Sequence, residues 1–139
     1  MFGTHVLVQS SLDPRDREIA ILRTGYRCGS EYEWGQHAVI AREQCGMDDE
    51  EIARIAAGAD AAGWSEREQL LLRATDELHD AQRIGDETWT QLQRHFDETQ
   101  VLDLIFAVGQ YTLVSMALNS LGVPLDDGVD GFGRNAPKR

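Results

Sequence analysis

The sequence predicts an all-α fold, and three observations lead to this prediction. Helix-start patterns recur along the chain, glycines suited to helix ends follow them, and almost no stretch has the pattern of a β-strand. These signals outline six helices, at residues 14–28, 31–45, 49–58, 66–82, 87–95 and 98–121.

The first two predicted helices have clear start and stop signals. Asp13 is a suitable N-cap, and Pro14 follows it at the first helical position, where a missing N–H leaves no bond unmade. Ser30 and Glu33 match the capping box, in which the cap hydroxyl and the glutamate each bond a free backbone N–H. Gly46 ends this second helix, because glycine readily adopts the left-handed conformation found after helix C-termini.

The four later helices are predicted from the same signals. One begins after a plainer cap at Asp86, and the other three begin at capping boxes: Asp48 with Glu51, Ser65 with Glu68, and Asp97 with Gln100. The predicted stops are Gly58 or Gly63, Gly85, and Gly122 with Pro124 just beyond. No linker divides the helices, so we expect one domain over residues 1–125. The tail, 126–139, is rich in Gly and Asp and is expected to be flexible.

Length and charge narrow the classes of function. A chain of 139 residues that is 42% hydrophobic can build one core without metals or disulfides. The net charge of −11 argues against nucleic acid and anionic membranes as partners, and it is compatible with a small-molecule substrate. The two cysteines, Cys28 and Cys45, form no Cys-x-x-Cys motif, and the N-terminus has no signal-peptide pattern, so a cytoplasmic location is expected.

The last predicted helix is almost entirely apolar. Asp103, Gln110 and Asn119 interrupt residues 101–121, which favours a buried core helix over a membrane span. A helix that is hydrophobic all round must be covered, either by the rest of the fold or by a second subunit. The sequence therefore favours a homo-oligomer.

Glu33 and His37 are the first candidates for chemistry. Residues four apart share a helix face, and on a helical wheel this pair borders the apolar side formed by Trp34, Ala38 and Ala41. Histidine has an ordinary pKa of about 6.5, which suits general acid–base catalysis, with Glu33 as its partner. In the alternative interpretation, Glu33 only completes the capping box and His37 is a packed core histidine.

Other chemistries have weaker support in the sequence. Glu33 and His37 could supply two metal ligands, but no second motif offers a third and a fourth, so no metal is expected. Cys28 and Cys45 are interpreted as packing residues, because their spacing does not bring them together. No phosphate-binding glycine loop or dinucleotide fingerprint occurs, so no cofactor is expected.

The stretch Glu-Tyr-Glu-Trp-Gly-Gln-His at 31–37 carries a family resemblance. With residues 17–23, 108–111, 119 and 122–125, it resembles the carboxymuconolactone decarboxylase family, which includes the alkylhydroperoxidase D proteins. The resemblance covers roughly residues 12–126. It implies a helical fold that assembles as trimers or hexamers. Such members usually have another helical segment before the Pro14 region, whereas this chain begins almost at it.

The resemblance also assigns site residues and shows a departure. In the peroxidase branch, a Cys-x-x-Cys is served by a histidine and a glutamate, which fall on His37 and Glu18. The two cysteine positions hold Ser30 and Glu33 here, and these side chains cannot cycle through sulfenic acid and disulfide. Dithiol peroxidase chemistry is therefore not expected at this site.

The remaining residues resemble the decarboxylase branch, a group of lyases that need no cofactor. The resemblance implies an acid–base enzyme for a small lactone or carbonyl compound, with His37, Glu33 and Glu18 as catalytic residues. Tyr32, Trp34 and Ser30 are the candidate substrate-binding residues, and candidates for a substrate carboxylate are Arg23, Arg27 and Arg42. Two alternatives stay open: an antioxidant protein that uses Cys28 or Cys45, and a non-catalytic helical oligomer that binds a ligand.

Overall fold

The computed structural model describes residues 2–136, and every regular element in this range is a helix. The all-α prediction is confirmed. The elements are α1 (Phe2–Thr4), the π-helix η1 (His5–Gln9), α2 (Pro14–Arg27), α3 (Glu31–Cys45), α4 (Asp49–Ala57), α5 (Glu66–Ala81), α6 (Asp86–Leu92), α7 (Glu98–Leu121) and the 3-10 helix η2 (Gly133–Asn135).

The six predicted helices correspond to α2 to α7, with corrections at the end of α5 and at both ends of α6. Helix α5 ends at Ala81, because Gln82 adopts the left-handed conformation with φ of 60°, so the predicted stop at Gly85 is wrong. Gly85 is instead the N-cap of α6, one residue before the predicted cap. Helix α6 ends at Leu92, three residues before the predicted end.

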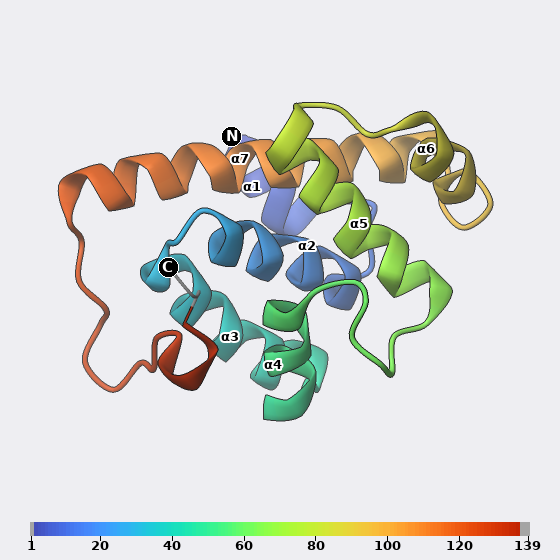
Figure 1. The fold of residues 1–139 in the computed structure, drawn as a ribbon. Coiled ribbons are helices and arrows are strands. Elements are labelled where there is room, and N and C mark those ends of the chain that lie inside the picture. Colours follow the sequence, from blue (N-terminus) through green and yellow to red (C-terminus); the bar gives the residue numbers. More distant parts are fainter. Residues whose placement is uncertain (1, 137–139) are drawn as a thin grey trace.

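Helix α2 lies at the centre of the molecule (Figure 1), with α7 on one side, α3 on the other and α5 across it. Nine of its 14 residues are buried, among them the run from Ile19 to Leu22, which has no exposed surface. The four side chains of this run are all apolar, as is expected of a helix that is covered on every side.

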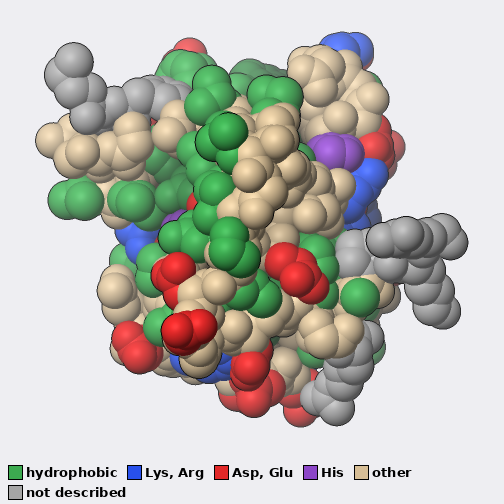
Figure 2. Space-filling view, turned by 90° about the vertical axis from the view of Figure 1, so that its left-hand side faces the viewer, with side chains coloured by type: hydrophobic (Ala, Val, Ile, Leu, Met, Phe, Trp, Pro, Cys, Tyr) green, Lys and Arg blue, Asp and Glu red, His purple; other side chains and the backbone are tan. Residues whose placement is uncertain are grey.

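Helix α7 is only partly covered, in contrast to the expectation that it is a core helix. One side packs on α2, while Leu113 and Met116 on another side are 58% and 60% exposed. By length and composition α7 could cross a membrane, but 39% of its most apolar stretch is buried in the fold. Figure 2 shows hydrophobic side chains gathered on the face of the molecule where α7 ends.

The segment after α7 folds back onto α3 (Figure 1, red). Phe132 is 6% exposed and its ring packs against Tyr26 and Trp34, at centroid distances of 5.5 and 5.8 Å. Gly35 makes this contact possible, because a Cβ there would lie 2.8 Å from the carbonyl oxygen of Asp130. This packing was not indicated by the sequence, which predicted a flexible tail from residue 126; residues 137–139 of that tail lie outside the described residues.

The N-terminal helical turns α1 and η1 were not predicted from the sequence. The first predicted helix began only at Pro14. Asp103 of α7 holds this segment in place. Its carboxylate accepts hydrogen bonds from His5 Nε2 at 2.8 Å and from the N–H and hydroxyl of Ser11 at 2.7 and 2.5 Å. Val6 is buried beside Ile21 and Tyr111, so the segment covers part of the α2–α7 contact.

Candidate functional site

The three residues predicted to be catalytic converge in the structure. His37 Nδ1 lies 2.7 Å from Glu18 Oε2 and donates a hydrogen bond to it, and His37 Nε2 lies 3.4 Å from Glu33 Oε2. Glu18 comes from the buried face of α2, and the other two residues lie one turn apart on α3. The imidazole therefore stands between two carboxylates.

Helix capping at the start of α3 leaves the Glu33 carboxylate free for this contact. The Ser30 hydroxyl accepts the N–H of Glu33 at 3.4 Å, which is half of the predicted capping box. The second half is wrong, because the Ser30 N–H donates to the carbonyl oxygen of Gly25 at 2.8 Å instead. Glu33 points to His37, so the interpretation that it only completes a capping box is not supported.

Burial and neighbouring charge make Glu33 harder to ionise. Burial raises the pKa of its carboxyl group, the Glu18 charge raises the pKa further, and His37 partly offsets both. Its Oε2 is buried and has no hydrogen-bond partner among the described residues. A buried carboxyl group with a raised pKa beside an imidazole is a candidate for proton transfer.

Arg17 supports the site from the far side of Glu18, and the sequence analysis missed it. Its Nε donates to Glu18 Oε1 at 3.1 Å, and its Nη1 donates to the carbonyl oxygen of Leu7 at 2.5 Å. Successive helix residues point about 100° apart, so no periodic pattern links positions 17 and 18. Only the bend of a long side chain brings this guanidinium to Glu18.

Tyr111 of α7 closes the other side of the imidazole. The two rings meet edge to face, with centroids 4.8 Å apart. Burial raises the pKa of the Tyr111 hydroxyl, and the charges of Glu33 and Glu18 raise it further, so it remains protonated. Tyr111 belongs to the stretch 108–111 that carries the family resemblance, but no role was predicted for it.

The trio is nearly closed to solvent. His37 is 5% and Glu33 is 7% exposed, and neither they nor Glu18 line any of the four main cavities found in the described part of the chain. A substrate can therefore reach His37 Nε2 only if a covering side chain, such as Tyr111, moves.

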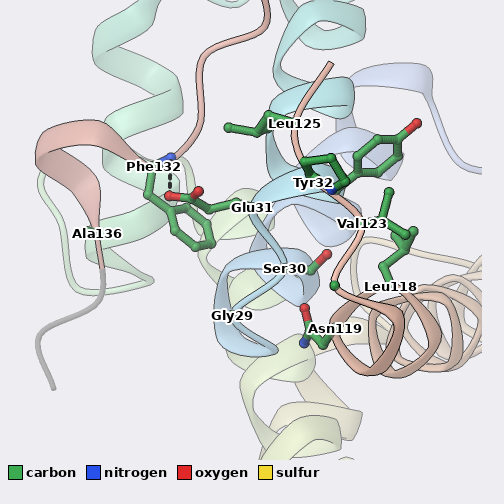
Figure 3. A pocket seen from close by; sticks show the side chains of 12 residues that line it. Gly29, Ser30, Glu31, Tyr32, Leu118, Asn119, Val123, Leu125, Phe132 and Ala136 are labelled. Carbon is green, nitrogen blue, oxygen red and sulfur yellow. Dashed lines mark hydrogen bonds between the residues drawn. The ribbon is translucent and has the colours of Figure 1, made fainter. Parts of the chain in front are cut away.

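The predicted substrate-binding residues are divided between a groove and the core. Ser30 and Tyr32 line a groove of about 830 Å³ between the start of α3 and the end of α7 (Figure 3). Trp34 is 2% exposed and packs in the core with Tyr26 and Phe132. The contact of all three with a substrate stays a prediction.

The three arginines proposed for a substrate carboxylate have other partners. Arg23 bonds Asp76 and the carbonyl oxygens of Ile55 and Ala56. Arg27 pairs with Asp76 and Asp80, and Arg42 pairs with Asp49. None of these pairs involves Glu18, Glu33 or His37.

The cysteines lie apart from each other and carry protonated thiols. Cys28 precedes α3 and Cys45 ends it, so about 20 Å of helix separates them, far beyond the reach of a disulfide. Burial raises the pKa of both thiols. Cys28 Sγ lies 3.8 Å from His79 Nδ1. Among the residues described, no group of three or more His, Cys, Asp or Glu side chains could hold a metal ion.

Comparison with known proteins agrees with this fold. The model of the carboxymuconolactone decarboxylase family matches residues 2–77, more than half of the chain. The crystal structure of a protein of unknown function from Agrobacterium tumefaciens, a candidate antioxidant defence protein AhpD, superposes with a TM-score of 0.82 at 16% identity. The match covers 90% of this chain and 86% of that one. No curated protein matches the chain.

Proposed function

Because this chain belongs to the carboxymuconolactone decarboxylase family, we propose that it is a cofactor-independent acid–base enzyme acting on a small lactone or carbonyl compound. One observation supports the proposal above all: the His37 imidazole stands between the carboxyl groups of Glu18 and Glu33, at 2.7 and 3.4 Å. An imidazole held in this way can take a proton from carbon and return it, as general acid–base catalysis requires.

Each residue has a distinct role in this proposal. Glu18 accepts the Nδ1 proton of His37 and so fixes the neutral tautomer whose Nε2 is basic. Arg17 holds the Glu18 carboxylate in position. Nε2 removes a proton next to the substrate carbonyl, and Glu33, with its raised pKa, supplies a proton to the product. The proton on Nε2 then passes to Glu33 Oε2, 3.4 Å away, which restores both groups.

The antioxidant alternative would need a reactive thiolate. The family positions for cysteine hold Ser30 and Glu33, and a raised pKa at Cys28 and Cys45 lowers the thiolate fraction at neutral pH. A Cys28→Ser/Cys45→Ser double variant separates the two functions. It loses hydroperoxide consumption in the antioxidant case and keeps full activity in the acid–base case.

The low exposure of His37 favours a second candidate, a non-catalytic ligand-binding protein. In that case His37 and the two carboxylates are a buried polar network that fixes the packing of α2 on α3. The effect of His37→Gln on catalysis distinguishes this candidate from the enzyme.

Replacement of His37 by Gln tests the proposed catalysis. A panel of small lactones and carbonyl compounds is incubated with the protein in D2O, and exchange of the proton next to the carbonyl is followed by NMR. Wild type should accelerate exchange for at least one compound, and His37→Gln should lower that rate about 10²- to 10⁴-fold. His95→Gln, at an exposed ion pair with Glu66, is the matched control and should retain the rate.

Two outcomes would contradict the proposal. One is exchange by His37→Gln at the wild-type rate, and the other is no acceleration of any compound by the wild type. Circular dichroism of both variants should show helix content equal to that of the wild type, so that a lost rate is not due to unfolding. We further propose that the protein works in the cytoplasm as a homo-oligomer, with neither nucleic acid nor membrane as partner.

A further inference from the structure

The groove between α3 and α7 lies outside the acid–base trio. Along α3, Ser30 precedes His37 by seven residues, and along α7, Leu118 follows Tyr111 by seven, which is about 10 Å on each helix. Because the His37 and Tyr111 rings are in contact, the groove occupies the same seam between the helices, about 10 Å along it from these two rings, while Glu33 directly follows the lining residue Tyr32.

The third wall of the groove is the segment after α7, and specific contacts hold it. Gln36 Nε2 donates to Asp126 Oδ2 at 2.7 Å, and the Phe132 N–H donates to Glu31 Oε1 at 3.3 Å, the bond drawn in Figure 3. Only a glycine at position 35 leaves room for Val129 and the Asp130 carbonyl group. Two hydrogen bonds and the close packing at Gly35 thus hold this wall against α3.

The lining of the groove indicates the chemistry of its ligand. Leu118, Val123, Leu125 and the Phe132 ring offer apolar surface to a ring-sized molecule. Among the lining residues that the structure describes, Glu31 is the one charged residue, and its carboxylate disfavours an anionic ligand. The Glu33 N–H of α3 is taken by the Ser30 hydroxyl, which leaves the N–H groups of Glu31 and Tyr32 without an intrahelical partner by helix geometry; these favour an oxygen acceptor over a cation.

From these features we infer that the groove is a binding site for an uncharged, ring-sized apolar molecule that carries one hydroxyl or carbonyl oxygen. The apolar ring lies against Val123, Leu125 and Phe132, and the oxygen accepts from the first turn of α3. This inference goes beyond the proposed function, because none of the three acid–base residues lines the groove.

Binding of 2-naphthol and of 2-naphthoate to the full chain tests the inference. The two probes have the same ring system, but the second is an anion. Chemical shifts of ¹⁵N-labelled backbone amides suit the weak affinity expected for molecules of this size. For 2-naphthol the shifts should cluster at residues 29–32 and 118–125, and binding should be at least about fivefold tighter than that of 2-naphthoate.

Three variants locate the site. Val123→Trp fills the groove and should abolish these shifts, and Gly35→Ala displaces the third wall and should weaken binding at least fivefold. Gly109→Ala is the matched control, because a Cβ at that helical position meets nothing within 4 Å, and it should bind like the wild type.

Several results would overturn the inference: shifts that cluster elsewhere, 2-naphthoate binding as tightly as 2-naphthol, or Val123→Trp binding like the wild type. His37→Gln should leave the binding of 2-naphthol unchanged. The inferred binding site can therefore be wrong while the proposed catalysis is right, and the catalysis can be wrong while the binding site is right.

Discussion

At the scale of one residue, the buried Glu33 carboxylate lowers the stability of the fold. The residue is 7% exposed, and burial is the main cause of the raised pKa of its carboxyl group. The folded protein therefore holds the proton to a higher pH than the unfolded chain does, so between the two pKa values the free energy of unfolding falls as the pH rises. Above the raised pKa of the folded state, the loss of stability is constant. Below the ordinary pKa of 4.5 there is no loss.

Replacement of Glu33 by Gln should therefore stabilise the protein at pH 8 and leave its stability nearly unchanged at pH 4. The amide is uncharged and nearly the same shape, so it removes the penalty for the buried charge. Urea unfolding at the two pH values measures this difference. A lower stability of Glu33→Gln at pH 8 would show instead that the carboxylate gains more from His37 than burial costs it.

The site residues differ in how well they could be predicted from the sequence. Helical spacing alone predicted that Glu33 and His37 share a face, because residues four apart always do. Glu18 came only from the family resemblance, since no local pattern links residues 19 positions apart. Arg17 and Tyr111 were missed, because one reaches Glu18 by bending and the other comes from α7.

At the scale of elements, local signals succeeded where a side chain makes the cap. The bounds of α3 and α7 were predicted correctly, because Ser30 and Asp97 bond the backbone of the next turn. Gln82 ends α5 in a conformation that usually requires glycine, so the sequence carried no signal there. Helix η1 and the docked tail depend on partners about 90 to 105 residues away, which no local pattern can show.

The docking of the tail predicts the effect of Phe132→Ala. Loss of the buried ring should lower the free energy of unfolding by about 2–3 kcal/mol, below the usual cost for a core phenylalanine because the segment can move away. Hydrogen exchange should become faster over residues 123–136, while α2 and α7 keep their protection. Leu121→Ala, at a position that is 78% exposed, is the control and should change stability by less than about 0.5 kcal/mol.

Hydrogen exchange in Phe132→Ala shows which contacts hold the tail on α3. Unchanged exchange in Phe132→Ala would mean that the hydrogen bonds of Glu31 and Gln36 hold the segment without the aromatic contact.

At the scale of the whole molecule, two properties oppose each other. The chain carries a net charge of −11, which makes copies repel, yet α7 exposes Leu102, Phe106, Leu113 and Met116 along one side. Residues 102 to 116 extend over about 21 Å of helix, a length suited to pairing with the same helix of another copy. We expect apolar burial to favour this assembly and repulsion to limit it, so added salt should strengthen it.

Replacement of Leu113 and Met116 by Glu should break this assembly. In a symmetric contact each new carboxylate meets another across the interface, and burying unpaired like charges is strongly unfavourable. Both side chains are largely exposed, so the fold of each copy should be retained. Sedimentation velocity should show an oligomer for the wild type, larger at 0.5 M than at 0.05 M salt, and a monomer for the double variant. Thr90→Glu on α6 adds a charge at an exposed polar position and should assemble like the wild type. A monomeric wild type at both salt concentrations would contradict the assembly, and so would an oligomeric double variant.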